Sequence, residues 1–458
     1  MLCACIGEKT RVAALALLRS LPMEVTFAEI RLDLLDDPSP EPFCAEAADR
    51  LVVTCRRPRD GGHFDGSEEE RLGFLARARS AGARFIDLEM DADDRMAGDA
   101  RGVIRSFHDV TGTPPDLDRV ATELRRRRGE AWKLAVTARD LSDSMKVLAC
   151  LERHRGGFAC MAMGPAGLIT RVLAESRGSF LTFCAARDGA ETAPGQVSAS
   201  EMLHHYRVRH LGRRPSIYGL LGTGIAHSLS PRLHNGWFAR RAERCVYLPF
   251  DTTDLDDFMA FARTLPLSGW SVTAPFKEAI STKLDRLSRS ARLAGCVNTV
   301  VCRKGKMVGY NTDVRALVSL IRRARGRSPV LVLGSGSTAK AACRALSAAG
   351  YSVMLSARRD RAARQAAADL RIWFVPWGER GSVRASAIVN ATSVGHGGRP
   401  GAPLPDTALR TGQLVIDFPY GPRETDLVRA ARARSCVVVD GKRILLEQAR
   451  LQRRLFRD

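Results

Sequence analysis

Short apolar runs alternate with arginine- and alanine-rich helical stretches throughout the N-terminal part of the chain. Alternation of strand and helix predicts parallel strands joined by helical crossovers. Eight such units in succession predict a (β/α)8 TIM barrel. The stretch 91–102 is very short for a crossover, so a six-stranded open sheet remains an alternative. The eight runs are Leu2–Ile6, Phe27–Leu32, Leu51–Cys55, Phe85–Met90, Val103–Phe107, Trp132–Val136, Phe158–Met163 and Phe180–Ala185.

A second α/β pattern begins at Ser216, after a polar, basic stretch that ends at Pro215 and is typical of a helix end and a linker. Further on, the run PVLVLGSGSTAKAACRALSAAGYSVMLSARR predicts a nucleotide-binding unit of strand, glycine turn and helix. The remaining strands are predicted at SIYGLLG, Val246–Phe250, Gly269–Thr273, Val297–Cys302 and Met307–Tyr310, and the last helices at Asp426–Arg434 and Arg443–Arg454.

Charge and composition narrow the classes of function. The 458 residues are 45% hydrophobic and 26% charged, which excludes fibrous and disordered proteins. A net charge of +21 arises from 62 arginines and only 9 lysines. The arginines are spread over many segments without interleaved aromatic residues, which argues against a nucleic-acid partner and suits anionic small substrates. Because lysine is this scarce, a lysine inside an apolar strand is a candidate for a specific role.

Cysteine usage and segment lengths indicate a cytoplasmic protein. The 12 cysteines are scattered and several lie in apolar runs, as reduced core thiols do. Neither a CxxC pair nor a Cys/His cluster indicates a structural zinc, so we expect no metal. No apolar run is long enough to span a membrane. The first residues are charged too early for a secretory signal.

Polar residues at the ends of the predicted barrel strands are the first candidate site, because that end of a barrel carries its chemistry. Lys133 lies among apolar neighbours, where desolvation would lower its pKa and favour Schiff-base chemistry. The alternative is a strand-end lysine paired with a carboxylate such as Glu29. His108 is suited to proton transfer near neutral pH, or is a core histidine bonded to the backbone. The candidates are Glu29, Arg31, Arg56, His108, Lys133, Arg171 and Gln196.

The motifs EIRLD, TCR followed by DGGHFDGSEEER, SFHD, WKLAV, MAMGPAGLITR and APGQ resemble, in order, those of type I 3-dehydroquinate dehydratases. The resemblance implies that Lys133 forms an imine with the ketone of 3-dehydroquinate and that His108 is the general acid/base. Asp60 stands where the family has a glutamate that orients the histidine, and Thr192 replaces a serine. The residues implied to hold the substrate are Glu29, Arg31, Arg56, Arg171, Thr192 and Gln196.

The second half carries a glycine turn and a lysine–aspartate pair. Gly334-x-Gly336 can present backbone N–H groups to a pyrophosphate. Arg358, at the end of the next predicted strand, replaces the acidic residue of an NAD site and favours NADP. Lys277 and Asp313 could transfer the proton that accompanies hydride transfer, or form a surface salt bridge.

These segments resemble shikimate dehydrogenase through HSLSPRLHN, SVTAPFK, GCVNTVV, YNTD, LGSGSTA, NATSVG, DFPYGPRET and GKRILLEQA. The resemblance implies that Lys277 and Asp313 are the catalytic pair. It implies substrate contacts from Ser228, Ser230, Thr273, Asn298, Tyr420 and Gln448. It implies an NADP site made of Gly334, Ser335, Gly336, Ser337, Arg358, Asn390, Thr392 and Ser393.

Together the halves resemble the bifunctional dehydratase–dehydrogenases of the shikimate pathway of aromatic amino-acid synthesis. We expect a dehydratase barrel at 1–207, a linker at 208–215, a substrate domain at 216–312 with the helix 440–458, and a Rossmann domain at 313–439. The alternatives are a decayed barrel beside an active shikimate or quinate dehydrogenase and, remotely, a nucleic-acid-binding protein. The expected partners are the small substrates 3-dehydroquinate, 3-dehydroshikimate and shikimate, with a homodimer possible and no membrane or nucleic-acid partner.

Overall fold

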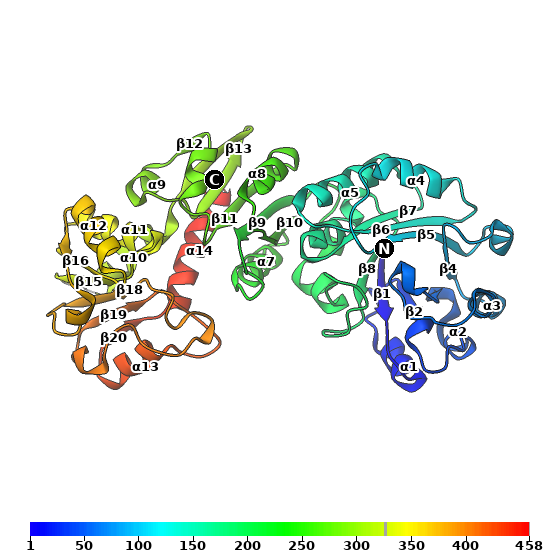
Figure 1. Ribbon diagram of the computed structural model, residues 1–458, viewed down its shortest axis with the longest axis horizontal. Coiled ribbons are helices and arrows are strands. Elements are labelled where there is room, and N and C mark those ends of the chain that lie inside the picture. The colour runs from blue at the N-terminus through cyan, green and yellow to red at the C-terminus, as the bar shows by residue number, and fades with distance from the viewer. Residues whose placement is uncertain (325–327, 458) are drawn as a thin grey trace. The chain divides into compact units, whose positions relative to one another are not determined.

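The structure is a computed structural model that describes residues 1–324 and 328–457 (Figure 1). Its contacts divide the chain into two compact units. The first contains Met1–Ile217 and Asn235–Pro266, and the second contains Tyr218–His234 and the chain from Leu267 onward. Residues 325–327 of the expected Rossmann domain and residue 458 of the expected last helix lie outside the described residues.

Eight parallel strands form the first sheet, and each begins and ends within two residues of its predicted apolar run. Their order, β7-β6-β5-β4-β3-β2-β1-β8, is that of a nearly closed barrel, which confirms the predicted fold and makes the six-stranded alternative wrong. The strands are β1 Leu2–Ile6, β2 Phe27–Arg31, β3 Leu51–Thr54, β4 Phe85–Glu89, β5 Val103–Asp109, β6 Ala131–Thr137, β7 Phe158–Met163 and β8 Thr182–Ala185.

Helices connect most of the barrel strands, and the short stretch 91–102 is the exception. It holds only a 3-10 helix, Asp94–Ala97, because so few residues leave no room for a full helical crossover. The buried guanidinium of Arg105 fixes this stretch by donating to the carbonyl oxygens of Glu89 and Ala92 at 2.9 and 3.0 Å. The α-helices are α1 Arg11–Ser20, α2 Glu41–Ala47, α3 Glu68–Ser80, α4 Leu117–Arg125, α5 Leu141–Arg153 and α6 Leu168–Val172.

Alternating side chains along the strands divide the barrel core in two. One set fills the interior, where Phe27, Phe85 and Phe183 pack with smaller residues. The other set faces the helices, as Leu134 and Cys160 do against α4 and α5. Apolar packing fills much of the interior, and the charged strand residues described below are carried on this rigid frame.

A second, mixed sheet has the strand order β10-β9-β11-β13-β14-β12. Within it β13 runs antiparallel to both β11 and β14. Its strands are β9 Ser216–Gly222, β10 Cys245–Asp251, β11 Leu267–Val272, β12 Arg286–Leu287, β13 Thr299–Arg303 and β14 Lys306–Tyr310. The helices of this region are α7 Ser230–Arg240, α8 Leu255–Thr264 and α9 Arg289–Ala294.

The third sheet is wholly parallel and has the order β17-β16-β15-β18-β19-β20. Numbered from its own first strand, this is the 3-2-1-4-5-6 order of dinucleotide-binding folds, which confirms the Rossmann prediction. The strands are β15 Val330–Leu333, β16 Val353–Ser356, β17 Trp373–Phe374, β18 Ala387–Asn390, β19 Leu414–Asp417 and β20 Val437–Val439. The helices are α10 Thr312–Arg323, α11 Ser337–Ala348, α12 Asp360–Leu370, α13 Asp426–Ala433 and α14 Gly441–Arg457.

The order reverses between β15 and β18, and this reversal positions a ligand site. Leu333 pairs with Asn390 at the carboxyl ends of these two strands. Ligands of open α/β sheets bind at such a point. Among the described residues, no helix is both long and apolar enough to cross a membrane.

Candidate active sites

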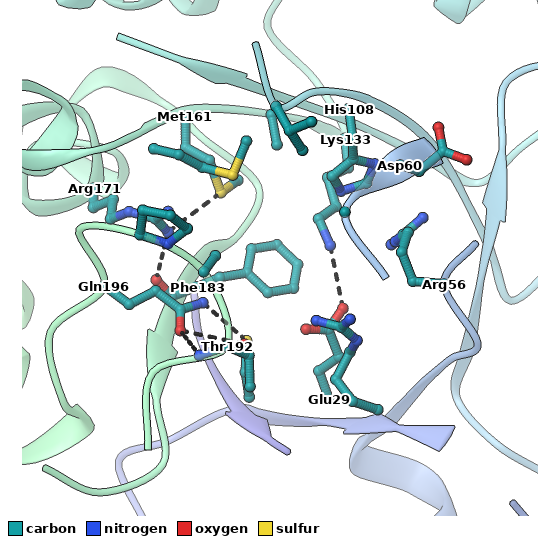
Figure 2. A pocket seen from close by; sticks show the side chains of 18 residues that line it. Glu29, Arg56, Asp60, His108, Lys133, Met161, Arg171, Phe183, Thr192 and Gln196 are labelled. Carbon is teal, nitrogen blue, oxygen red and sulfur yellow. Dashed lines mark hydrogen bonds and ion pairs between the residues drawn. The ribbon is translucent and has the colours of Figure 1, made fainter. Parts of the chain in front are cut away.

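A cavity of about 160 Å³ collects the side chains predicted from the barrel strands (Figure 2). The figure shows Lys133 and Glu29 pointing toward one another across it. Its lining residues are Cys5, Glu29, Arg31, Arg56, Asp60, Gly61, His108, Val110, Lys133, Ala135, Met161, Met163, Arg171, Phe183, Thr192, Ala193, Pro194 and Gln196. The structure therefore brings together all the residues that the dehydratase resemblance implies.

Lys133 is buried between two carboxylates. Its Nζ lies 3.2 Å from Glu29 Oε1 and 3.1 Å from Asp87 Oδ2, and 4.0 Å from the centre of the Phe183 ring. Burial alone would lower the pKa of Lys133, but the charges of Asp87 and Glu29 outweigh burial and raise it. The lowered pKa expected from the sequence is therefore wrong, because that expectation counted the apolar neighbours and not the two carboxylates.

A buried ion-pair network extends from Lys133 and includes residues that the sequence analysis missed. Arg56 contacts Asp87 Oδ2 at 2.7 Å and Glu89 Oε1 at 2.9 Å, and it donates to Ser106 Oγ at 3.0 Å. Although burial of Asp87 opposes its ionisation, Arg56 and Lys133 hold its pKa well below the ordinary value. Asp87 and Glu89 interrupt the apolar strand FIDLE. The same rule that selected Glu29 would have found them.

His108 and Asp60 line the cavity without a hydrogen bond between them. Burial, followed by the charges of Arg56 and Lys133, holds the pKa of His108 well below its ordinary value. Its Nδ1 is shielded from solvent and has no hydrogen-bond partner among the described residues. The Asp60 carboxylate instead accepts from Arg57 Nε at 2.8 Å. The His108 ring is therefore a neutral base, and the Asp60 carboxylate does not orient it through a hydrogen bond.

The arginines that line the cavity differ in their partners. Arg31 forms a buried two-point ion pair with Asp33, at 2.9 and 2.7 Å. Arg171 has no carboxylate partner among the described residues, and its Nη1 donates to the Phe183 carbonyl at 3.1 Å. Burial lowers its pKa to about 10, so it is still a cation at neutral pH. A buried, uncompensated guanidinium in a cavity is suited to bind the carboxylate of a ligand.

Thr192 and Gln196 form the remaining wall. Gln196 Oε1 accepts from the Thr192 backbone N–H at 2.9 Å and from its hydroxyl at 3.3 Å. Gln196 Nε2 lies 3.5 Å from Cys5 Sγ. These bonds fix the amide so that its polar atoms border the cavity. Cys5 is a further residue that the sequence analysis missed, since its run of small and apolar residues gave no polar signal.

The second site has a lysine–aspartate pair at its centre. Lys277 Nζ contacts Asp313 Oδ2 at 2.6 Å, and both side chains are nearly buried, with exposed fractions of 15% and 10%. Burial alone would lower the pKa of Lys277, but Asp313 reverses the effect and raises it. Asp313 lies in the first turn of α10, which the Asn311 side chain caps by accepting from Val314 N–H. Lys277 is thus an ammonium that the Asp313 carboxylate orients, and it can release a proton.

Polar groups from several elements lie next to this pair. Asn298 is buried, and its side chain donates to Thr312 Oγ1 at 3.0 Å and to Gln448 Oε1 at 3.4 Å. The second bond links the mixed sheet to α14. Thr273 follows β11 on the same turn as Lys277, and its backbone N–H donates to the Leu221 carbonyl. The structure thus connects Asn298 and Gln448 directly.

Ser228, Ser230 and Tyr420 form a second group of hydroxyls. The Ser228 hydroxyl accepts from the Ser230 backbone N–H at 3.3 Å. Burial raises the pKa of Tyr420, whereas a hydrogen bond with Ser228 and the charge of Lys277 oppose the rise. Tyr420 therefore lies close enough to interact with both Ser228 and the catalytic lysine candidate.

The predicted dinucleotide turn has the geometry that a phosphate requires. Gly334 has φ +119° after β15, and a Cβ there would lie 2.8 Å from the Ala391 carbonyl oxygen, so only glycine fits. Gly336 is the N-cap of α11, and a Cβ there would meet no atom within 4 Å. The first N–H groups of α11 and the partly buried Ser335 and Ser337 border the same turn. These donors fit a pyrophosphate.

Asn390 positions the second loop of this region. Its side chain donates to Asp417 Oδ1 at 2.6 Å, and its Oδ1 accepts from the backbone and hydroxyl of Thr392 at 3.0 and 2.7 Å. Ser393 is exposed at the tip of the loop. Arg358 follows β16, is exposed, and forms no ion pair among the described residues. A free guanidinium at this position fits a 2′-phosphate.

The fold and the two sites define a two-part α/β enzyme. Its barrel holds a lysine and a neutral histidine beside an unpaired arginine, and its Rossmann part adjoins a lysine–aspartate pair. Comparisons with known proteins agree with both parts. Residues 2–213 match the model of the type I 3-dehydroquinase family, and residues 220–300 match that of the shikimate dehydrogenase substrate binding domain.

Relatives match the whole chain or its second half. A bifunctional chloroplastic 3-dehydroquinate dehydratase/shikimate dehydrogenase from Arabidopsis thaliana is 29% identical over 93% of this chain and 77% of its own length. A shikimate dehydrogenase (NADP(+)) from Rhodospirillum rubrum is 36% identical over 51% of this chain and 89% of its own. The crystal structure of shikimate dehydrogenase from Aquifex aeolicus is 30% identical and covers 53% of this chain and 92% of that one, with a TM-score of 0.50.

The chain belongs to the shikimate dehydrogenase family through its second half, joined to a type I 3-dehydroquinase in a bifunctional enzyme.

Proposed function

We propose that the chain catalyses two consecutive reactions. The barrel dehydrates 3-dehydroquinate to 3-dehydroshikimate, and the second unit reduces 3-dehydroshikimate to shikimate with NADPH. The observation that carries the proposal is the enclosure of two of the nine lysines, Lys133 and Lys277, each in ionic contact with buried or nearly buried carboxylates.

In the barrel, the Lys133 nitrogen attacks the ketone carbon of the substrate and water leaves to give an imine. The protonated imine withdraws electrons from the neighbouring carbon, so a weakly acidic C–H bond becomes removable. Lys133 is an ammonium at rest, because Asp87 and Glu29 raise its pKa. It must therefore lose a proton before it attacks. Neutral His108 in the same cavity can accept that proton and return it to the carbinolamine hydroxyl, which leaves as water, so the ring is neutral again when the protonated imine has formed.

His108 then transfers the protons of the elimination. Its pKa is held well below the ordinary value, so the ring stays unprotonated at neutral pH and can remove the proton beside the imine. The same ring, once protonated, can donate to the departing hydroxyl. Elimination releases water, and hydrolysis of the product imine restores Lys133.

The substrate carboxylate is held by the one cation of the cavity wall that lacks an anionic partner within the described residues, Arg171. Binding a carboxylate there would provide a partner for the Arg171 guanidinium, whose Nε has none among residues 1–324 and 328–457. Arg31 and Arg56 are already paired with Asp33, Asp87 and Glu89, so they orient neighbours and can donate only their remaining N–H groups. Gln196 and Thr192 would contact hydroxyls of the ring.

In the second unit, Lys277 donates the proton that the new hydroxyl oxygen needs. Asp313 raises the pKa of Lys277, so the proton is present at neutral pH, and the contact of 2.6 Å orients the ammonium. Asn298, Gln448, Ser228 and Tyr420 supply hydrogen bonds for the substrate hydroxyls and carboxylate. A nicotinamide bound beside this pair would supply the hydride.

The cofactor proposed is NADP, held by the residues around the third sheet. The α11 N-terminus with Ser335 and Ser337 would take the pyrophosphate, and Arg358 the 2′-phosphate. Asn390, Thr392 and Ser393 would border the nicotinamide side. The Rhodospirillum rubrum relative is a shikimate dehydrogenase (NADP(+)), which supports this choice. The domain boundaries, a cytoplasmic location and a homodimer stay predictions.

A coupled assay with matched variants tests the proposal. With 3-dehydroquinate and NADPH, the parent chain should oxidise NADPH. Lys133→Met should stop oxidation from 3-dehydroquinate but not from added 3-dehydroshikimate. Lys277→Met should stop oxidation from both, while 3-dehydroshikimate still accumulates from 3-dehydroquinate. Loss of both activities in either variant, or neither activity in the parent, would contradict the assignment.

A further inference from the structure

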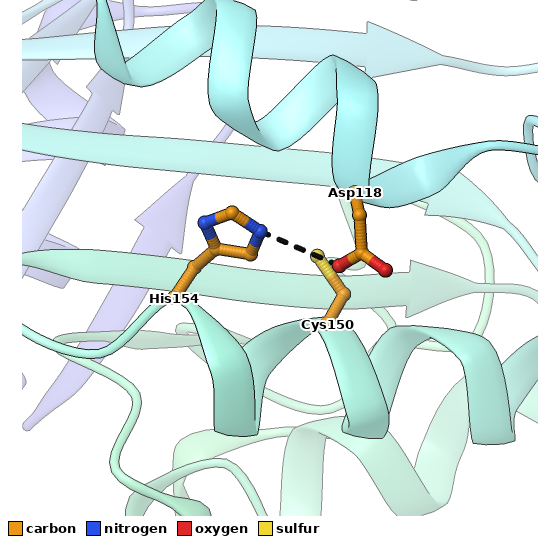
Figure 3. A group of neighbouring side chains, drawn as sticks. All are labelled: Asp118, Cys150 and His154. Atoms are coloured by element: carbon orange, nitrogen blue, oxygen red, sulfur yellow. Dashed lines mark ion pairs between the residues drawn. The ribbon is translucent and has the colours of Figure 1, made fainter.

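Three metal-binding side chains meet on the outside of the barrel, among residues that neither active site uses. Asp118 lies in the first turn of α4, Cys150 lies on α5, and His154 directly follows α5. Their carboxylate oxygen, thiol sulfur and ring nitrogen all lie within 4.8 Å of one another. Figure 3 shows the carboxylate of one helix meeting the thiol and imidazole of the other.

The local fold explains why these groups converge. His154 is the C-cap of α5, and its backbone N–H donates to the Cys150 carbonyl at 3.0 Å, which places it one turn beyond Cys150. Cys150 belongs to the apolar core that α4 and α5 share with β6 and β7. Asp118 and His154 are only partly buried, with side-chain exposures of 41% and 17%. The cluster therefore has a dry side at the thiol and a side open to solvent.

The three groups already interact through Asp118. His154 Nε2 lies 3.3 Å from Asp118 Oδ1, and the Cys150 thiol hydrogen-bonds to the same carboxylate. Arg153 contacts both carboxylate oxygens, with Nε 3.0 Å from Oδ1. Its side chain is 57% exposed and is free to turn away into solvent. A cation that replaced Arg153 would find a carboxylate, a thiol and an imidazole arranged around one point.

This donor set selects one chemical class of cation. Sulfur, nitrogen and a single carboxylate suit zinc, whereas calcium and magnesium need more oxygen ligands. Tetrahedral zinc places its ligand atoms about 3.3–3.8 Å apart, as its bond lengths require. His154 Nε2 and Asp118 Oδ1, 3.3 Å apart, already match this spacing, and the widest separation, at most 4.8 Å, would need to contract by about 1 Å. Water from the exposed side can supply the fourth ligand.

We propose that Asp118, Cys150 and His154 bind a zinc-class divalent cation that fastens α4 to the end of α5. No metal was expected from the sequence, which has neither a CxxC pair nor a Cys/His cluster, and Asp118 lies far along the chain from Cys150 and His154. The site is distinct from the Lys133 cavity, none of whose lining residues it shares. Binding should therefore stabilise the barrel without changing the chemistry of either reaction.

Cobalt(II) titration of the purified full-length chain tests the proposal, because a cobalt–thiolate bond has its own charge-transfer absorption. We expect one equivalent to produce this absorption and zinc to displace it. Cys150→Ser should abolish the absorption and His154→Gln should weaken cobalt binding at least tenfold. Arg153→Gln, which removes the competing cation, should tighten it.

Cys160 supplies a matched control. This buried thiol lies on β7 and neighbours Cys150, but it is not one of the three proposed ligands. Cys160→Ser should therefore keep the absorption. Zinc should raise the unfolding temperature of the parent and of Cys160→Ser by a few degrees, and not that of Cys150→Ser. Unchanged dehydratase activity verifies that each variant is folded. Absence of the thiolate absorption in the parent, or its persistence in Cys150→Ser, would overturn the proposal.

Discussion

The two active sites use the same pair of residue types in opposite ways. Lys133 extends from the middle of a barrel strand and is shared by two carboxylates at 3.1 and 3.2 Å. Lys277 lies on a turn after β11 and contacts one carboxylate at 2.6 Å. In both cases the carboxylates raise the lysine pKa.

The consequence of a raised pKa differs between the sites. A proton donor such as Lys277 must carry its proton at neutral pH, so its partner serves the reaction directly. A nucleophile such as Lys133 must lose the proton first, so its partners oppose the first step. The barrel therefore needs a base beside the lysine, and His108, whose pKa is lowered by burial, fits that need. Burial by itself therefore does not define the role of a lysine.

The largest effects should come from the lysines themselves. Lys133→Met should reduce dehydratase turnover by roughly four orders of magnitude or more, as loss of a covalent nucleophile does. Lys277→Met should reduce dehydrogenase turnover by about 10²–10⁴, the usual contribution of a positioned acid. Each variant should leave the other activity within twofold, about 0.4 kcal/mol. Steady-state assays of both reactions measure this, and a crossed effect would break the comparison.

Arg171→Met should have the next largest effect. Removing the guanidinium leaves the substrate carboxylate without the cation proposed to bind it, which costs about 2–5 kcal/mol and lowers kcat/KM by roughly 30-fold or more. Arg31→Met would leave Asp33 as a buried unpaired charge, so it should reduce stability as well. Comparing kcat/KM with the urea midpoint separates the two cases. An Arg171 variant with unchanged KM and kcat would contradict the carboxylate role.

Asp60→Glu should have a smaller effect and in the opposite direction. The added methylene would bring the carboxylate nearer to His108 Nδ1, which has no partner among the described residues. We expect kcat of the dehydratase to rise by about 3- to 10-fold, the value of one added hydrogen bond. The pH profile should also shift, since a nearby carboxylate raises the histidine pKa. Asp60→Asn is the control, and an equal gain there would exclude this explanation.

A separate prediction concerns stability in the second unit rather than catalysis. Burial raises the pKa of Asp417 to about 6, against the lowering effect of hydrogen bonds from Thr425 and Asn390. A raised pKa means that its contribution to stability is complete below about pH 3.8 and is lost as pH rises through about 6. The side chain of Asp417→Asn does not titrate. The free energy of unfolding of this variant, relative to that of the parent, should therefore rise by on the order of 3 kcal/mol between pH 4 and pH 7. Urea unfolding at matched pH measures this, and parallel pH curves would contradict it.

The fold was largely predictable because both kinds of sheet leave clear patterns. Each barrel strand is a short apolar run, and parallel strands buried on both faces give such runs. The missing helix between β4 and β5 could be anticipated from the length of 91–102, but the Arg105 bonds that fix the segment could not. The glycine turn predicted a Rossmann domain, and the observed strand order of the third sheet agrees with that prediction.

The sites were predictable as sets of residues but not in their electrostatics. Lys133 was expected to have a lowered pKa because its chain neighbours are apolar, whereas its spatial neighbours, Asp87 and Glu29, are 46 and 104 residues away. The pairing of Asp60 with Arg57 likewise depends on side-chain geometry that no spacing encodes. Contacts between distant segments decide which charge each group carries.

The most direct test of the central claim is chemical trapping of the imine. The chain is incubated with 3-dehydroquinate, reduced with sodium borohydride, digested and analysed by mass spectrometry. We expect a stable substrate adduct on the peptide that contains Lys133, absent from Lys133→Met and unchanged in Lys277→Met. No adduct in the parent, or an adduct on another lysine, would contradict it.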